Sequence, residues 1–217
     1  MTPRAQAQTD NSRFKLVAIT FDDGNVMGRS RRVLEALRRY CAQATYFIVG
    51  RSLRSNHDIL SRLQNGGHSV QSHTYQHRYP SDTTLEEALK DRERFARELS
   101  AIIGVEPAMM RAPGGKDEFY ANNAFGYPLI HWSVAGGDSG GTDPSVVEET
   151  VLKQVRDGSV VLLHETNEAV PEYTATILKE LTREGFLFVT VEELYAARGV
   201  ALEPNRIYYK PTDVRDP

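Results

Sequence analysis

The alternation of short apolar runs with amphipathic helical segments restricts the fold of this chain more than any other feature. Runs typical of β-strands occur at 15–21, 44–49, 68–72, 108–111, 127–134, 159–163 and 186–191. Apolar residues at helical spacing follow several of these runs, as at 29–40, 82–103, 144–156 and 173–183. Strands that alternate with helices form βα units and a mostly parallel sheet. About seven strands favour closure into a barrel over an open sheet.

The same alternation continues without a linker-like change in composition, which predicts one folded domain over residues 14–203. Residues 1–13 are polar and aperiodic, and we expect a flexible lead-in there. Residues 204–217 lack a clear period, and we expect an irregular C-terminal tail. Hydrophobic residues make up 40% of the chain and charged residues 25%, which is ordinary for a globular domain and argues against intrinsic disorder.

Charge, cysteine content and the length of apolar runs exclude several classes of protein. The chain has 26 Lys and Arg against 29 Asp and Glu, and the resulting net charge of −3 argues against a nucleic-acid binder. The single Cys41 excludes an intrachain disulfide and a multi-cysteine zinc site. No run approaches the roughly 18–20 apolar residues that span a bilayer. The first residues lack the apolar core of a signal peptide, so a cytosolic protein and one whose leader is absent both remain open.

Polar side chains follow the predicted strands at the points where chemistry is carried out in βα barrels. The chemistry of such barrels takes place at the carboxyl ends of their strands. The polar residues at these positions are Asp22, Asp23, His73, His77, Arg111, Asp138 and His164. We therefore expect them to converge on one face of the barrel.

Two pairs of these residues suggest a metal site. Adjacent carboxylates repel, and a divalent cation bound by one of Asp22 and Asp23 would leave the other free as a base, although a solvated turn is the alternative. His73 and His77 are four residues apart and would share one face of a helical turn, unless they are two surface histidines. Two imidazoles and one carboxylate leave coordination positions open, and zinc, cobalt, manganese, nickel or iron would suit them. His68 is out of this register, and we interpret it as structural.

The remaining polar residues fit acid–base chemistry or ordinary packing. His164 ends a buried strand, where it would be a general acid or a hydrogen-bonded core histidine. Arg111 would hold Asp22 ionised, or would form an ordinary salt bridge. Gly114, in the Gly114-Gly115 pair, leaves a backbone N–H exposed that suits an oxyanion hole.

In their order along the chain, these segments resemble the NodB-homology polysaccharide deacetylases, carbohydrate esterase family 4. The matching motifs are Thr20-Phe21-Asp22-Asp23-Gly24, His73-Thr74-Tyr75-Gln76-His77, Arg111-Ala112-Pro113-Gly114-Gly115 and Leu162-Leu163-His164. The resemblance implies an α/β fold, a distorted (β/α)7 barrel, and makes residues 14–203 the catalytic domain. It also implies a catalytic base (Asp22), a brace for that base (Arg111), a general acid (His164), an acetate pocket residue (Leu162) and three metal ligands (Asp23, His73 and His77).

Two motifs depart from the family pattern. Gly114 stands where the third motif usually has an aromatic residue, so an aromatic contact with the sugar is lost. The fourth motif, usually Asp-x-x-Asp-Trp, has Ala135 at the first Asp, Asp138 at the second and Ser139 at the Trp. The first Asp tunes the catalytic histidine in the family, so the protonation of His164 depends on substitution by Asp138 or Glu165. Trp132 lies near the site or in the core.

The resemblance implies a metal-dependent hydrolase that removes N-acetyl groups from amino-sugar polymers of the peptidoglycan or chitin type. The implied cofactor is one divalent ion, first of all zinc, and the implied partner is an acetylated oligo- or polysaccharide. Such substrates suggest an extracellular or cell-envelope protein. Two alternatives remain: a weakened or non-catalytic carbohydrate-binding protein on this fold, and a hydrolase of O-acetyl esters or other amides. The polymer, the metal and the oligomeric state are not encoded in any motif.

Overall fold

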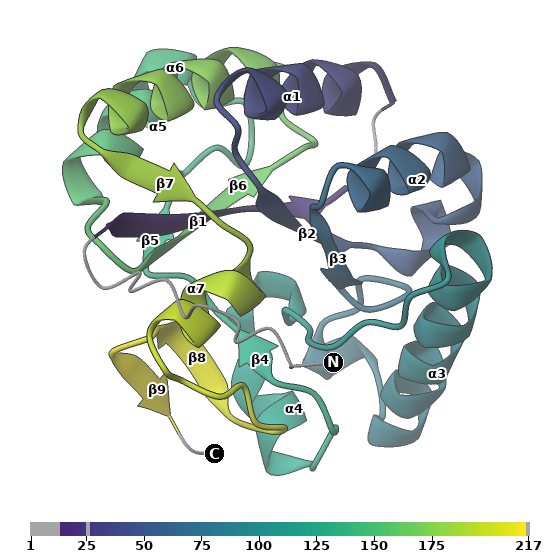
Figure 1. Ribbon diagram of the computed structural model, residues 1–217. Coiled ribbons are helices and arrows are strands. Elements are labelled where there is room, and N and C mark those ends of the chain that lie inside the picture. Colours follow the sequence, from purple (N-terminus) through teal and green to yellow (C-terminus); the bar gives the residue numbers. More distant parts are fainter. Residues whose placement is uncertain (1–13, 25–26, 216–217) are drawn as a thin grey trace, which may run out of the picture.

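The computed structural model describes residues 14–24 and 27–215, and its centre is a parallel sheet (Figure 1). The strand order is β3–β2–β1–β6–β5, and β7 pairs with the first residues of β1. The bounds are β1 Lys15–Asp23, β2 Ala44–Ile48, β3 Ser69–Ser72, β5 Val134–Ala135, β6 Ser159–His164 and β7 Phe186–Phe188. The predicted lead-in, residues 1–13, lies outside the described residues.

A short bridge continues the sheet beyond β3 towards a closed barrel. Met110 forms parallel bridges to Ser72 of β3 and to Leu129 of β4 (Leu129–Ile130). The backbone N–H of Ile130 also donates to Met110 O over 2.8 Å. The segments predicted as strands therefore run parallel around one core, which confirms the distorted (β/α)7 barrel.

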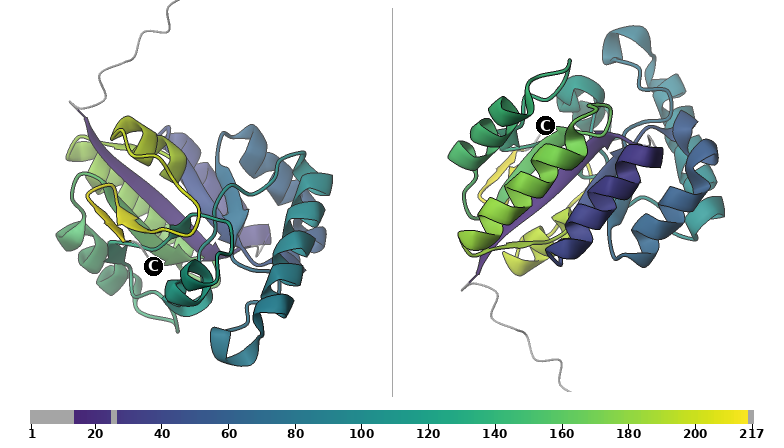
Figure 2. Two further views of the ribbon diagram at one scale, coloured as in Figure 1. Left: turned by 90° about the horizontal axis from the view of Figure 1, so that it is seen from below. Right: turned by 90° about the horizontal axis from the view of Figure 1, so that it is seen from above.

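Seven α-helices within the described residues follow or cover these strands. They are α1 Met27–Arg39, α2 His57–Asn65, α3 Leu85–Ile103, α4 Asp117–Asn122, α5 Pro144–Gln154, α6 Val170–Arg183 and α7 Val191–Ala197. Thr84 and Glu87 form a capping box at α3, and Asp143 caps α5 ahead of Pro144. Figure 2 shows α1 and α6 side by side over β1. No described helix is both long and apolar enough to cross a membrane.

Strand β1 is buried on both faces, which makes it a rigid support for the residues at its end. Val17, Ile19 and Phe21 pack in the outer layer against α1 and α6, whereas Leu16 and Ala18 pack in the barrel interior. Alternate residues point to opposite faces of a strand. Residues 20 and 22 of β1 therefore face the barrel interior, and so do residues 162 and 164 of β6, which pair with them in register.

The C-terminal tail was wrongly expected to be irregular. Residues Ile207–Lys210 form β8 and residues Asp213–Arg215 form β9, an antiparallel pair. Strand β8 also pairs with β4, and Tyr208 is fully buried. Ile207 packs in one apolar cluster with Leu129 of β4, and Tyr208 packs in another with Ile130. That tertiary partner, rather than a local period, makes the segment a strand.

The single strand predicted at 127–134 was also wrong in its extent. Strand β4 pairs with β8, whereas β5 pairs with β6. Between the two strands, His131 N–H donates to Tyr208 O (2.9 Å) and Ser133 N–H donates to Val160 O (3.0 Å). The backbone changes partner between these two residues, so one apolar run forms two short strands.

Candidate active site

The predicted site residues gather at the carboxyl ends of the central strands. Asp22 and His164 are register partners on neighbouring strands β1 and β6. His73 follows the last residue of β3, and Arg111 follows the Met110 bridge to β3. The sequence-based expectation that these residues share one face of the barrel is confirmed by their contacts.

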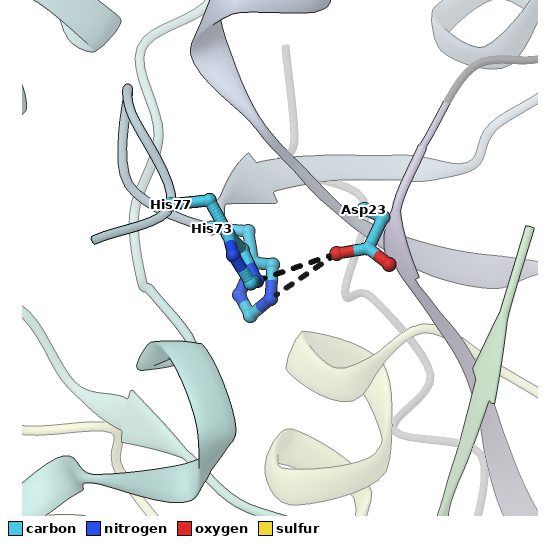
Figure 3. Close-up of side chains that lie close together, drawn as sticks. All are labelled: Asp23, His73 and His77. Carbon is cyan, nitrogen blue, oxygen red and sulfur yellow. Dashed lines mark ion pairs between the residues drawn. The ribbon is translucent and has the colours of Figure 1, made fainter. Parts of the chain in front are cut away.

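Asp23, His73 and His77 form a group whose ligand atoms all lie within 4.8 Å of one another (Figure 3). Asp23 Oδ1 is 3.8 Å from His73 Nε2 and 3.4 Å from His77 Nε2. A tetrahedral zinc ion with ligand bonds of about 2.0–2.1 Å separates its ligands by roughly 3.3–3.4 Å. The spacing and the chemistry of these donors therefore fit a divalent cation.

Neighbouring groups orient these ligands. His73 Nδ1 is 2.9 Å from Arg111 O, and since a carbonyl only accepts, this nitrogen donates and Nε2 is left for a metal. The second oxygen of Asp23, Oδ2, accepts from Thr166 Oγ1 over 3.4 Å. Burial lowers the pKa of His77, helped by the charge of His73 and opposed by Asp23, which favours the neutral, metal-binding imidazole.

The two histidines are not on a helical turn, contrary to expectation. Residues 73–78 form a bent loop in which Thr74 has φ 62° and His77 has φ 57°. Thr74 Oγ1 accepts from His77 N over 3.0 Å, which closes this turn. The loop, instead of a helix, brings the two rings to a centroid separation of 4.9 Å.

Asp22 is paired with a fully buried arginine. Arg111 Nη1 donates to Asp22 Oδ1 over 2.7 Å and to Thr20 Oγ1 over 2.7 Å. Its other nitrogens donate to Ile130 O (2.8 Å) and His131 O (3.0 Å). Asp22 Oδ2 is 3.7 Å from His73 Nε2. One carboxylate oxygen is therefore anchored, and the other faces the metal-ligand group.

His164 is held by Asp138, which answers the question raised by the altered fourth motif. Asp138 Oδ1 accepts from His164 Nδ1 (2.8 Å) and Oδ2 accepts from the His164 backbone N–H (2.7 Å). Burial opposes the imidazolium, but the hydrogen bond and charge of Asp138, aided by Asp22 and Asp23, raise the pKa of His164. Glu165 accepts instead from Ser30 Oγ over 3.0 Å.

Sequence reasoning missed two supports of this site. Tyr173 on α6 donates its hydroxyl to Asp138 Oδ2 over 2.6 Å, and Asn167 Nδ2 donates to Asp138 O over 2.7 Å. Tyr173 is fully buried, so its hydroxyl needed a partner. A tyrosine on the apolar face of a predicted helix was the available signal.

The predicted substrate-side residues lie around the same centre. Gly114 is exposed in the turn Pro113–Gly115, with φ 62°. Leu162 is 6% exposed and precedes His164 on the same face of β6. Trp132 stacks on His131 with centroids 3.9 Å apart, and Arg111 Cζ is 5.8 Å from its ring.

His68 lies apart from this group, as expected. Its Nδ1 accepts from Ala44 N over 3.2 Å, just before the amino end of β3. Burial lowers the pKa of His68 to about 4, so it is neutral at neutral pH. This histidine has a structural role at the opposite end of the strand from His73.

Known proteins with similar sequences or structures support the same interpretation. A family model described as polysaccharide deacetylase matches residues 9–127, more than half of the chain. The peptidoglycan-N-acetylglucosamine deacetylase PgdA of Listeria monocytogenes is 31% identical over 201 residues, which cover 93% of this chain and 42% of that protein. The chain thus spans less than half the length of this relative.

Two further proteins match over most of their own length. A peptidoglycan-N-acetylglucosamine deacetylase of Bacillus cereus is 33% identical over 195 residues, covering 83% of this chain and 88% of that protein. The structure of a family 4 acetyl xylan esterase from Clostridium thermocellum in complex with a cobalt ion superposes with a TM-score of 0.84. It is 28% identical, and the match covers 90% of this chain and 98% of that one. By sequence and by fold, the chain belongs to the polysaccharide deacetylases with NodB homology, carbohydrate esterase family 4.

Proposed function

We propose that this chain removes N-acetyl groups from acetylated amino-sugar polymers of the peptidoglycan or chitin type. One observation carries the proposal: the buried Asp22–Arg111 pair lies between a candidate metal site and His164. That arrangement combines a positioned base, a positioned acid and a site for a Lewis acid. The relatives named as peptidoglycan deacetylases support the amide substrate.

Asp23, His73 and His77 would hold one divalent cation, for which zinc is the first candidate and cobalt, manganese, nickel and iron are others. The cation would polarise the acetyl carbonyl and lower the pKa of a bound water. His77 is suited to this role because burial, the first cause of its lowered pKa, keeps it neutral.

The residues around that site would move the protons. Asp22, oriented by Arg111, accepts a proton from the attacking water through its second oxygen. Gly114 donates its backbone N–H to the developing oxyanion. His164, as an imidazolium kept by Asp138, donates from Nε2 to the leaving nitrogen. Leu162 lines the pocket for the acetyl methyl group, and Trp132 contacts the substrate beside Arg111.

An O-acetyl ester is the second candidate substrate, because one similar structure is that of an acetyl xylan esterase. The raised pKa of His164 favours the amide substrate, because an amine leaves only when its nitrogen is protonated. The departure of an alkoxide from an ester depends less on an acid. An amino-sugar polymer of the cell wall would be met in the cell envelope or outside the cell. We therefore propose an extracellular or envelope location.

The proposal is tested by acetate release from chitooligosaccharides and from peptidoglycan, with zinc or cobalt added, for the wild type and Asp22→Asn. We expect kcat to fall by at least about 100-fold in the variant, because it lacks the base. Asp58→Asn, which places a carboxamide at an exposed position of α2, should behave like the wild type.

Two controls keep the result specific. The side-chain amide in Asp22→Asn would still accept from Arg111, but the buried guanidinium would lose its counter-charge, so the melting temperature of the variant must be measured. Metal binding should persist, since Asp23, His73 and His77 are unchanged. Equal acetate release by a folded, metal-binding Asp22→Asn protein would refute the role of Asp22.

A further inference from the structure

Gly114 has no side chain, and the aromatic ring of Tyr79 occupies the space that this leaves. A Cβ built on Gly114 would lie 2.5 Å from Cε1 of Tyr79, closer than real Cβ contacts allow. The Tyr79 ring therefore packs directly on the Pro113–Gly115 turn. The sequence motifs do not include Tyr79, so its position emerges only from the fold.

The same ring also lies next to a candidate metal ligand. The centroids of Tyr79 and His77 are 6.1 Å apart, with the rings at 75° to each other. Tyr79 nevertheless remains 44% exposed. Phe14, the other strongly exposed aromatic among the described residues, precedes β1 at the opposite end of the barrel. Tyr79 is thus an aromatic face, open to solvent, at the rim of the active site.

A surface hollow of about 290 Å³ is lined in part by this ring. Its walls are Tyr79, Pro80, Ser81, Lys116, Glu118 and Phe119. This volume is just below the roughly 300–1,000 Å³ typical of ligand pockets. Two aromatic rings and a proline supply apolar surface, whereas Lys116 and Glu118 are exposed and charged. A pyranose ring has matching properties, with an apolar face of C–H groups and a rim of hydroxyls.

We propose that Tyr79 is the platform of a sugar subsite next to the catalytic centre, and that it stacks on the ring adjoining the reacting acetamido sugar. The subsite continues the active site on the Gly114 side, since Tyr79 touches both the metal-ligand loop and the Gly114 turn. Lys116 and Glu118 hydrogen-bond to hydroxyls of the same ring. This subsite rests on the proposed function, because it assumes an oligosaccharide substrate.

The kinetic test measures acetate release from a tetramer of N-acetylglucosamine. In Tyr79→Ala we expect the KM for the tetramer to rise about tenfold, which corresponds to about 1.4 kcal/mol, while kcat changes less than twofold. Tyr79→Leu keeps the bulk that packs on Gly114 but lacks a flat ring, so the KM should rise similarly. Tyr79→Phe should restore the wild-type KM. Phe14→Ala removes an equally exposed aromatic far from the site and should have no effect.

A binding titration separates this proposal from the proposed function. With the tetramer as ligand, the Kd measured by calorimetry should rise about tenfold from Asp22→Asn to Asp22→Asn/Tyr79→Leu. This measurement needs no turnover, so it decides the subsite even if the protein releases no acetate. Equal Kd and KM values with and without the ring, or no binding of the tetramer to the wild type, would overturn the subsite. If the protein releases acetate but its Kd and KM do not change when the Tyr79 ring is removed, the subsite is wrong and the proposed function stands.

Discussion

Asp138 orients His164 through two separate contacts. One carboxylate oxygen holds Nδ1, so the imidazole presents Nε2 to the site, and the other oxygen fixes the backbone of the same residue. Tyr173 and Asn167 hold Asp138 in turn. Ala135 stands where the family's fourth motif has its first acidic residue, and the remaining one, Asp138, supplies a negative charge that favours the imidazolium of His164.

We expect Asp138→Asn to move the alkaline limb of the kcat/KM profile to lower pH. His164 must be protonated to act as the acid, so activity falls as the pH rises through its pKa. The negative charge of Asp138 raises that pKa against the opposing effect of burial, and an amide supplies no charge. Acetate release measured from pH 5 to 10 checks this expectation.

The control for this prediction is Tyr173→Phe, which removes a hydrogen bond to Asp138 but keeps the carboxylate. This variant should cost about 1 kcal/mol of unfolding free energy without lowering the pKa of the alkaline limb. An unchanged limb in Asp138→Asn, with the protein folded, would show that His164 is not the titrating acid.

At the scale of elements, α3 holds the loop that carries the two candidate metal-ligating histidines. Tyr75, between them, donates its hydroxyl to Glu98 over 3.1 Å, and the N–H of Gln76 donates to Asp91 Oδ2 over 3.1 Å. Glu98 is buried and is paired with Arg54 and Arg94, both at 3.0 Å. Helix α3 lies beside β3 (Figure 1). Its side chains therefore stabilise the left-handed residues of the loop.

We expect Glu98→Gln to weaken metal binding about tenfold, because the loop loses the charged centre that fixes Tyr75. At saturating metal, kcat should stay within about twofold of the wild type, since no ligand is changed. Titration of zinc or cobalt by calorimetry measures the first effect, and acetate release measures the second. Glu93→Gln, on the exposed side of the same helix, is the matched control. Identical metal affinities in the two variants would contradict this role of α3.

The histidine pair illustrates how far local patterns predict a site. The spacing of His73 and His77 correctly indicated a shared site, but the helical turn was wrong. Thr74 and His77 have positive φ angles, and the residues between them, Tyr75 and Gln76, contact α3, which lies at 85–103 in the sequence. The residue types were enough to predict the chemistry of the site. The backbone geometry was not predictable, because it involves tertiary partners that no local pattern contains. The position of Tyr79 likewise depends on a residue distant in sequence, because its ring occupies the space beside Gly114.

For the whole molecule, the alternation of strands and helices predicted a parallel sheet and the face that bears the site, whereas the (β/α)7 barrel was implied by the family resemblance. The parallel order β3–β2–β1–β6–β5 brings residues from 22 to 164 together because carboxyl ends of parallel strands meet at one edge. Strands that depend on distant partners were not predictable. Strand β8 forms against β4 across almost eighty residues of sequence, and its two buried residues, Ile207 and Tyr208, are too few to form a period.

The acid stability of the whole molecule should depend on His68, far from the site. Burial lowers its pKa to about 4, compared with about 6.5 in the unfolded chain. Below pH 6.5 the unfolded chain therefore binds a proton that the folded protein excludes, and stability falls as the pH is lowered towards 4. This difference corresponds to about 3 kcal/mol at full effect.

The variant His68→Asn removes this titration while its side-chain oxygen can still accept from Ala44 N. We expect the loss of unfolding free energy between pH 7 and pH 4 to be about 2–3 kcal/mol smaller in the variant than in the wild type. Urea unfolding with a chelator present measures both proteins without a contribution from bound metal. The other histidines titrate alike in both proteins, so the difference isolates His68. Parallel losses in the two proteins would show that His68 accepts its proton in the folded state at its ordinary pKa.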